Sequence, residues 1–293
     1  MSTIFKGVAT ALITPFKDNT VDVDRFREQI EFQIASGVDA LVVLGTTGEP
    51  STLDGLEQKL CIQTAIQQTN HRVPVIVGTS SNNTSKAVQL SFQAQELGAD
   101  ALLITTPYYN KCTKAGIIEH YNTIAKSTSL PIIAYNVPSR TGVNIEVDTV
   151  KVLSKIKNIV ALKEASGNIS QISAIRQATK SSFDIYSGDD NLVVPTMSIG
   201  AIGTISVISN AFPTQVSELT KYCLSQKYKK ANKLQMQLLP VLQACYKEVN
   251  PIGIKAIMQY MNMDSGQLRL PLTNMKDKNL ENLYKNLDKY LKI

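Results

Sequence analysis

The chain has 293 residues, of which 43% are hydrophobic and 18% are charged. This length fits about two average domains, or one (β/α) barrel with an appendage, and the composition is that of a globular protein rather than a disordered one. The net charge of +6 does not gather into a basic block with interleaved aromatic residues, which argues against a nucleic-acid-binding surface.

Cysteine and histidine are too few and too scattered for several kinds of site. The four cysteines form no CxxC pair, and the chain holds only two histidines. A metal site, a disulfide framework and a Ser-His-Asp triad are therefore not expected. The first residues lack the apolar core of a signal peptide, and no apolar run reaches the roughly 18 residues of a membrane span. We expect a cytoplasmic protein with no membrane partner.

Short apolar runs, rich in β-branched residues, recur along most of the chain. They cover residues 7–16, 40–44, 75–78, 101–105, 132–135, 160–163, 184–186 and 202–207. Their centres lie about 28 residues apart, the size of a βα unit, and segments with helical spacing separate them. Eight such strands predict a (β/α)8 TIM barrel. The alternative is a doubly wound open sheet, which usually carries a G-x-G-x-x-G after a strand, and the chain has no such motif.

The pattern changes after the last of these runs. From residue 213 to the end there is no strand-like run, and helical segments dominate, among them residues 234–246 and 252–261. We predict a catalytic barrel over residues 1–224 and a small C-terminal helical domain over residues 225–293.

Lys163 is the first candidate catalytic residue, because it directly follows the apolar run at residues 159–162. In a barrel, the active site lies at the carboxyl ends of the strands. Burial there penalises the ammonium ion and lowers the pKa of a lysine, and a neutral, positioned amine can form a Schiff base with a carbonyl compound. A structural ion pair with a carboxylate is the alternative, and the strand alone favours neither.

Other polar residues follow neighbouring strands. Tyr135 ends the fifth run and either passes a proton or is a packed core residue. Arg140, in the next loop, either grips a carboxylate with two hydrogen bonds or is simply solvated. Residues 45–48 form either a plain turn or an anion-binding loop. Asp189 and Asp190 are not expected to bind a metal, because adjacent residues of a strand point opposite ways and no other ligands are evident.

Three segments, taken in order, resemble one known family. They are Gly-Thr-Thr-Gly-Glu at residues 45–49, Tyr-Asn-Val-Pro-Ser-Arg-Thr-Gly at residues 135–142 and Leu-Lys-Glu-Ala-Ser-Gly at residues 162–167. Together they resemble the pyruvate-dependent class I aldolases of the N-acetylneuraminate lyase superfamily, and within them the dihydrodipicolinate synthase family. The resemblance runs from Gly7 into the C-terminal helical region, where the Asn-Pro-Ile at residues 250–252 also matches.

The resemblance implies a lyase of lysine and diaminopimelate biosynthesis that uses no cofactor. Lys163 would form a Schiff base with pyruvate, and the enamine would attack the aldehyde of L-aspartate 4-semialdehyde. Tyr135, Thr47 and Tyr109 match the family's proton relay, with Tyr109 reaching in from a neighbouring subunit. The working unit is then a homodimer or a homotetramer.

The resemblance also assigns substrate-binding residues. The carboxylate of pyruvate would lie against Thr46 and Thr47, and Gly188 and Ile205 would line the same pocket. Arg140 matches the residue that recognises the carboxylate of the semialdehyde in this family.

Two alternative functions stay open. Other pyruvate-dependent aldolases, such as N-acetylneuraminate lyase and keto-deoxy-sugar aldolases, share the lysine and the tyrosine but not the Ser-Arg-Thr-Gly of residues 139–142. A barrel that binds small anions without catalysis would keep the loop at residues 45–48, but a desolvated Lys163 would add nothing to it.

Feedback control is a further expectation. Many bacterial relatives bind lysine as an inhibitor in a dimer-interface cleft, at the segments matching residues 50–58 and 82–86 and at Tyr108. Gln58 departs from that pattern, and Lys86 stands where lysine-sensitive relatives carry glutamate. An effector ammonium would meet a second ammonium there instead of a carboxylate. We therefore expect insensitivity to lysine.

Overall fold

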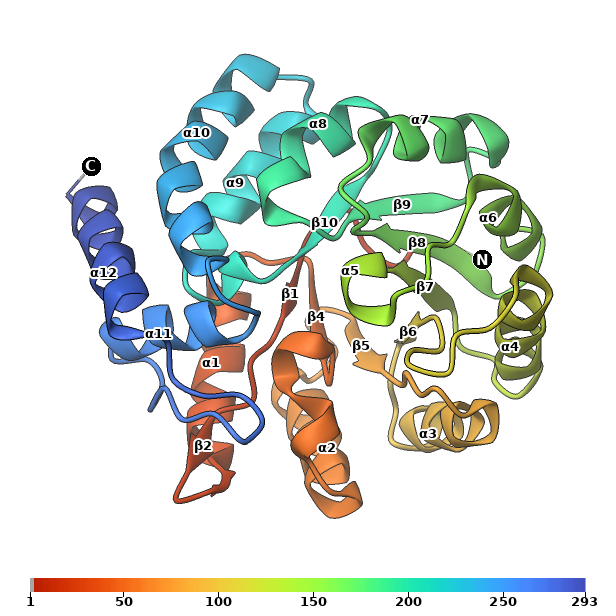
Figure 1. The fold of residues 1–293 in the computed structure, drawn as a ribbon, viewed down its shortest axis with the longest axis horizontal. Coiled ribbons are helices and arrows are strands. Elements are labelled where there is room, and N and C mark those ends of the chain that lie inside the picture. Colours follow the sequence, from red (N-terminus) through yellow and green to blue (C-terminus); the bar gives the residue numbers. More distant parts are fainter. Residues whose placement is uncertain (1–2, 293) are drawn as a thin grey trace.

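A computed structural model describes residues 3–292 of the chain. Eight parallel strands close into a barrel, and each strand pairs with the next one along the chain until β10 returns to β1 (Figure 1). Their bounds are β1 Gly7–Ala11, β4 Ala40–Val43, β5 Val75–Gly78, β6 Ala101–Thr105, β7 Ile132–Asn136, β8 Ile159–Glu164, β9 Asp184–Ser187 and β10 Gly203–Ser206. The predicted (β/α)8 barrel is confirmed.

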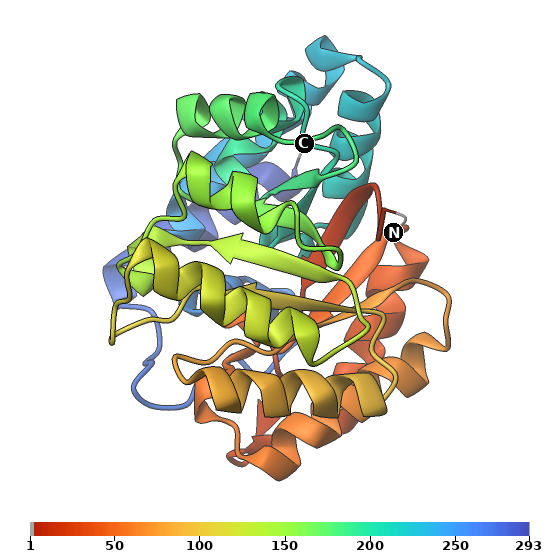
Figure 2. The ribbon, with the colours of Figure 1, turned by 90° about the vertical axis from the view of Figure 1, so that its right-hand side faces the viewer.

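Helices connect successive strands around the outside of the barrel, as the side view of Figure 2 shows for α3 and α4. The connecting helices are α1 Val23–Ala35, α2 Gly55–Thr69, α3 Thr84–Glu96, α4 Lys114–Lys126, α6 Val147–Leu153, α7 Ile169–Ala178 and α8 Val193–Ser198. The short α5, Pro138–Thr141, lies in the loop after β7, and α9, Pro213–Leu224, follows β10. Side-chain caps start several of the connecting helices. At α2, Asp54 accepts hydrogen bonds from two backbone N–H groups, and Glu57 completes a capping box.

The chain bends sharply where two predicted strands end. The run at residues 7–16 divides into β1 and the short β2, Phe16–Lys17, which pairs with β3, Thr20–Val21. Leu44 falls outside β4, because its φ of 56° is incompatible with a strand. A side chain at Gly78 of the adjacent β5 would collide with the Leu44 carbonyl, so glycine there makes room for the bend. This bend begins the loop at residues 45–49.

Two apolar layers hold the barrel together, one inside it and one between the strands and the helices. Alternate residues of a strand face the two layers. On β8, Ala161 belongs to the inner layer and Leu162 to the outer one. The same alternation points Lys163 into the barrel and Glu164 towards the helices.

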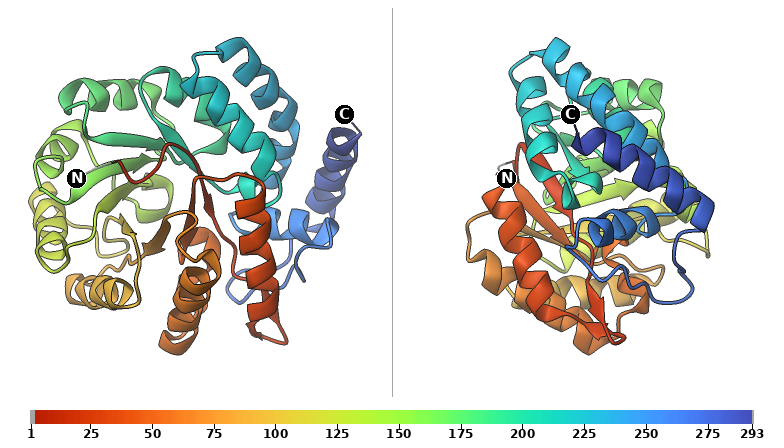
Figure 3. Two further views of the ribbon diagram at one scale, coloured as in Figure 1. Left: turned by 180° about the vertical axis from the view of Figure 1, so that it is seen from behind. Right: turned by 90° about the vertical axis from the view of Figure 1, so that its left-hand side faces the viewer.

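The C-terminal part of the chain consists of α10 Tyr228–Cys245, α11 Ile252–Tyr260 and α12 Asp277–Leu291. These helices lie together on one side of the barrel (Figure 3). Helix α10 packs against α8 and α9, and α12 packs against α10 and α11. The predicted domain boundary after residue 224 coincides with the end of α9, but one apolar layer runs from the barrel into these helices, so the division into two domains stays a prediction.

Within residues 3–292, no helix has the length and apolar character needed to cross a membrane.

Candidate active site

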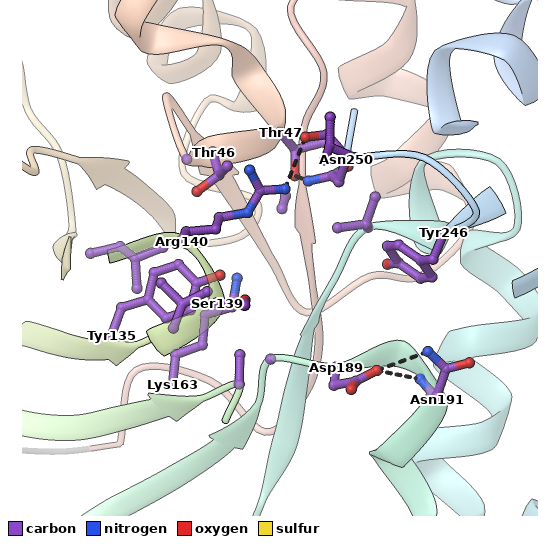
Figure 4. Close-up of a pocket in the computed structure, with 18 of the residues that line it drawn as sticks. Thr46, Thr47, Tyr135, Ser139, Arg140, Lys163, Asp189, Asn191, Tyr246 and Asn250 are labelled. Atoms are coloured by element: carbon purple, nitrogen blue, oxygen red, sulfur yellow. Dashed lines mark hydrogen bonds between the residues drawn. The ribbon is translucent and has the colours of Figure 1, made fainter. Parts of the chain in front are cut away.

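A cavity of about 330 Å³ lies at the carboxyl ends of the barrel strands (Figure 4). One side is formed by the barrel and the other by the segment that follows α10. The polar residues that line it are Thr46, Thr47, Tyr135, Ser139, Arg140, Lys163, Asp189, Asn191, Tyr246, Glu248 and Asn250. Six of the residues predicted from the sequence therefore meet in one place, namely Thr46, Thr47, Tyr135, Arg140, Lys163 and Gly188.

Lys163 reaches the cavity from the end of β8 and is 5% exposed. Its Nζ lies 4.2 Å from the centroid of the Tyr135 ring. Burial lowers the pKa of Lys163 to about 7, the negative charge of Asp190 opposes this shift, and the positive charge of Arg140 adds to it. A substantial fraction of the amine is therefore neutral near neutral pH and able to act as a nucleophile.

The carboxylate next to Lys163 in sequence does not pair with it. Glu164 points to the other face of β8, where it accepts hydrogen bonds from Asn136 Nδ2 at 3.0 and 3.1 Å and from the Ser166 backbone N–H at 2.7 Å. Within residues 3–292, Lys163 has no ion-pair partner within 4.0 Å. The described chain therefore offers Lys163 no carboxylate for the structural ion pair that was the alternative interpretation.

Tyr135 stands beside Lys163, because the two residues are register partners on β7 and β8. The phenol is 6% exposed, and its pKa rises to about 12, chiefly through burial, with the Arg140 charge acting in the opposite direction. Tyr135 therefore keeps its proton at neutral pH and can donate it to an atom held above Lys163.

The two loops opposite Lys163 are joined through Asn250. Thr47, in the short 3-10 helix Thr46–Gly48, accepts a hydrogen bond from Asn250 Nδ2 at 3.0 Å. Arg140, in α5, donates from Nη2 to the Asn250 carbonyl oxygen at 2.9 Å. The guanidinium thus lies between Thr46 and Asn250 at the mouth of the cavity (Figure 4).

Gly188 gives Lys163 its space. A Cβ at this position would lie 2.8 Å from Ala165 Cβ, 3.0 Å from Lys163 Cε and 3.1 Å from the Glu164 carbonyl oxygen. Any larger residue would displace the lysine, so glycine at the end of β9 is part of the geometry that positions the amine.

Two of the predicted residues do not line the cavity. Ile205 is 1% exposed and packs in the inner layer of the barrel. Tyr109 is 92% exposed and holds a φ of 69°, which is unusual for a bulky side chain. Their roles in binding and proton transfer stay predictions.

Asp189 and Asp190, which follow β9, accept hydrogen bonds from other residues of the chain. Asp190 accepts hydrogen bonds through Oδ2 from the backbone N–H groups of Val207 and Ile208 at 3.0 and 2.9 Å, and from the Tyr246 hydroxyl at 2.6 Å. Asp189 caps the following turn by accepting from Asn191. Across the described part of the chain, no three His, Cys, Asp or Glu side chains are grouped to hold a metal ion. Reaction without a cofactor stays a prediction.

Sequence reasoning missed the residues that the C-terminal segment brings to the cavity. Tyr246 and Glu248 carried no signal, and Asn250 was noted only as part of a matching motif. A polar residue between two helices looks like an ordinary loop residue. Only the packing of α10 and α11 against the barrel places these side chains opposite Lys163.

A second cavity of about 450 Å³ adjoins the first and shares Thr46, Tyr135 and Arg140 with it. Its outer part is lined by Pro50, Ser51, Gln58, Lys86 and Tyr108. Gln58 already donates through Nε2 to the carbonyl oxygens of Pro50 and Leu53, at 3.0 and 3.1 Å.

A closed (β/α)8 barrel with a desolvated lysine at its mouth defines an enzyme of the class I aldolase type. The model of the dihydrodipicolinate synthetase family matches residues 4–290. The 4-hydroxy-tetrahydrodipicolinate synthase of Caldicellulosiruptor saccharolyticus is 49% identical over 98% of this chain and 97% of the relative. That of Acetivibrio thermocellus is 47% identical over 98% of each chain. The chain belongs to the dihydrodipicolinate synthetase family.

Solved structures agree with this assignment. The chloride-inhibited dihydrodipicolinate synthase of Acinetobacter baumannii, complexed with pyruvate, superimposes with a TM-score of 0.97. It is 38% identical to this chain, and the match covers 99% of this chain and all of that one.

Proposed function

We propose that this chain condenses pyruvate with L-aspartate 4-semialdehyde, the reaction of a 4-hydroxy-tetrahydrodipicolinate synthase. The observation that carries the proposal is Lys163, a buried amine beside Tyr135 without a carboxylate partner in the described chain. An amine in this state is suited to nucleophilic catalysis and of little use to a protein that only binds anions. The names of the relatives support the choice of substrates.

The residues of the cavity divide the chemistry among them. Lys163 Nζ attacks the ketone carbon of pyruvate, and one water leaves as the imine forms. Loss of a methyl proton gives the enamine, whose carbon attacks the aldehyde to form the new C–C bond. The amino group of the semialdehyde then attacks the imine carbon, closing the ring and releasing Lys163. Tyr135 and Thr47 carry the protons in these steps, and the pyruvate carboxylate lies against Thr46 and Thr47.

Arg140 selects the second substrate in this proposal. Its guanidinium is exposed at the mouth of the cavity, so a carboxylate can approach it from solvent. We expect Arg140→Ala to lower kcat/KM for aspartate semialdehyde by about 100-fold, as for a lost charge-assisted pair, while pyruvate still forms its adduct on Lys163. Steady-state kinetics and adduct mass measure the two effects. Equal loss of both steps would argue against this role.

The choice between this reaction and that of a sugar aldolase is tested with a panel of aldehydes. With pyruvate fixed, aspartate semialdehyde, N-acetylmannosamine and glyceraldehyde are compared by kcat/KM. The proposal predicts turnover of the semialdehyde and little or none of the others. Preferred use of a polyhydroxylated aldehyde would identify a sugar aldolase instead.

The proposal extends to the assembly and its location. We place the enzyme in the cytoplasm as a homodimer or homotetramer, in which Tyr109 of one subunit completes the proton relay of another. The exposure of Tyr109 and its φ of 69° support a side chain that acts outside its own subunit. A monomer of full activity, measured by analytical ultracentrifugation at assay concentrations, would contradict it.

We further propose that lysine does not inhibit this enzyme. Lys86 brings a positive charge to the second cavity, and the amide of Gln58 is already bonded to backbone carbonyls. Activity should stay constant up to millimolar lysine, and Lys86→Glu should create or increase inhibition. Inhibition of the unmodified enzyme by submillimolar lysine, the range of a modest specific site, would refute this proposal.

A further inference from the structure

Asn250 forms hydrogen bonds to both loops opposite Lys163. It lies between α10 and α11, outside the barrel strands, and lines the cavity. Its side-chain Nδ2 is 3.0 Å from Thr47 Oγ1, and its backbone oxygen is 2.9 Å from Arg140 Nη2. Figure 4 draws Thr47, Asn250 and the guanidinium of Arg140 close together, with dashed lines for their hydrogen bonds.

The direction of the first contact matters for proton transfer. An amide nitrogen can only donate a hydrogen bond, whereas a hydroxyl has one proton and two acceptor lone pairs. With Asn250 Nδ2 as the donor, Thr47 Oγ1 is an acceptor in this contact. The hydroxyl proton of Thr47 is thereby left free and turned away from Asn250, available for a partner in the cavity.

We infer that Asn250 is a positioning residue, which fixes the Thr47 hydroxyl as a proton donor towards the cavity. This inference rests on the proposed function, in which Thr47 belongs to the proton relay. It gives the C-terminal segment a part in the chemistry that acts through Thr47, because within residues 3–292 this segment makes no hydrogen bond to Lys163.

The second contact supplies an internal control. Arg140 binds the backbone oxygen of Asn250, which Asn250→Ala leaves in place. The substitution therefore removes the Thr47 contact alone. If it acts only through Thr47, kcat falls while KM for the semialdehyde stays within about twofold; if it loosens the whole segment, Arg140 moves as well and KM rises with the fall in kcat.

The experiment is a double-mutant cycle of Asn250→Ala and Thr47→Val. We expect Asn250→Ala to lower kcat about 10- to 100-fold, the cost of a misoriented proton-transfer group. In the Thr47→Val background it should cost less than about twofold, because the hydroxyl it orients is gone. An equal loss in both backgrounds, or a kcat within twofold of the unmodified enzyme, overturns the inference.

Two more variants sharpen the result. Asn250→Asp keeps the shape but can only accept a hydrogen bond, so it draws the Thr47 proton towards itself, and it should lose at least as much kcat as Asn250→Ala. Unmodified kcat in Asn250→Asp also overturns the inference. Asn286→Ala is the matched control, since its amide donates to the Asn282 carbonyl on α12 and it does not line the cavity.

Reductive trapping of pyruvate separates the failure of this inference from the failure of the proposed function. If the unmodified enzyme forms no adduct on Lys163, both the proposed function and the inference on Asn250 are wrong. If the unmodified enzyme and Asn250→Ala both form the adduct, and the losses of kcat in the double-mutant cycle are additive, only the role of Asn250 is wrong. Thermal unfolding of each variant checks that the fold is intact.

Discussion

At the scale of single residues, the environment of Lys163 determines when it can react. Burial lowers its pKa to about 7, and only the neutral amine attacks a ketone. The neutral fraction grows as pH rises through 7, so kcat/KM for pyruvate should rise about tenfold per pH unit below that value and level off above about pH 8. The pH profile of kcat/KM from pH 5.5 to 9 measures this directly.

Arg140 provides the control for this profile. Its positive charge adds to the lowering of the Lys163 pKa, so Arg140→Ala should move the acid limb to higher pH. An acid limb near the ordinary pKa of lysine, in either protein, would contradict the electrostatic account.

Lys163 and Tyr135 could be predicted from the sequence pattern, because the chemistry lies at the ends of strands that the sequence marks clearly. Thr46, Thr47 and Gly188 were assigned only through the family resemblance. Lys163 and Tyr135 terminate apolar runs, and strand alternation then turns both into the barrel. The lowered pKa of Lys163 also follows from its position in the sequence, whereas its lack of an ion-pair partner within residues 3–292 does not. That depends on Asn136 and Ser166 binding Glu164 on the other face.

At the scale of elements, one buried ion pair ties the loop at residues 45–49 to α11. Lys255 Nζ lies 2.6 Å from Glu49 Oε1, and both side chains are almost fully buried. The ammonium also donates to the Gln267 carbonyl and lies 4.1 Å from the centre of the Phe16 ring. The loop that carries Thr46 and Thr47 is thus held from the C-terminal side as well as from the barrel.

Removing one partner of this pair leaves a buried charge uncompensated. We expect Lys255→Met to reduce the free energy of unfolding by about 3–5 kcal/mol. Lys255→Met/Glu49→Gln also removes the buried charge of Glu49, so part of the loss should be restored, although Asp264, which Lys255 also stabilises, keeps its charge. Urea denaturation followed by circular dichroism gives both values. Arg25→Met, which breaks an exposed pair with Glu28, should cost about 1 kcal/mol or less, and equal costs for the two pairs would contradict this account.

The pair of Lys255 and Glu49 also shows what the sequence could not predict, namely how the C-terminal helices pack against the barrel. The strands follow from local patterns, so seven of the eight predicted runs agree with the observed strands to within one residue at each end. The two predicted helical segments, 234–246 and 252–261, overlap α10 and α11. Nothing local links Glu49 to Lys255, which lie far apart in the sequence. The seating of α10 and α11 against the barrel, and with it the far wall of the cavity, emerges only from tertiary packing.

At the scale of the whole molecule, one buried histidine should make the free energy of unfolding depend on pH. His120, on α4, is 3% exposed, and burial lowers its pKa to about 4. In the unfolded chain this imidazole has its ordinary pKa of 6.5, so the unfolded state binds more protons between these two values. The titration of His120 alone should therefore lower the free energy of unfolding by roughly 3 kcal/mol as pH drops from 6.5 to 4, and the carboxyl groups with shifted pKa values add their own contributions.

Urea denaturation at several pH values tests this dependence. His120→Gln removes the titrating group and should flatten that part of the pH dependence. An unchanged slope in the variant would assign the acid sensitivity of the fold to other groups.

In the proposed reaction Lys163 forms a covalent imine with pyruvate, and reductive trapping with borohydride detects this imine. The protein is incubated with pyruvate and borohydride, and its intact mass and peptide map are then recorded. We expect one pyruvate-derived adduct per chain, confined to Lys163 and absent from Lys163→Arg. A folded protein that gives no adduct, or an adduct at another lysine, would contradict the proposed reaction.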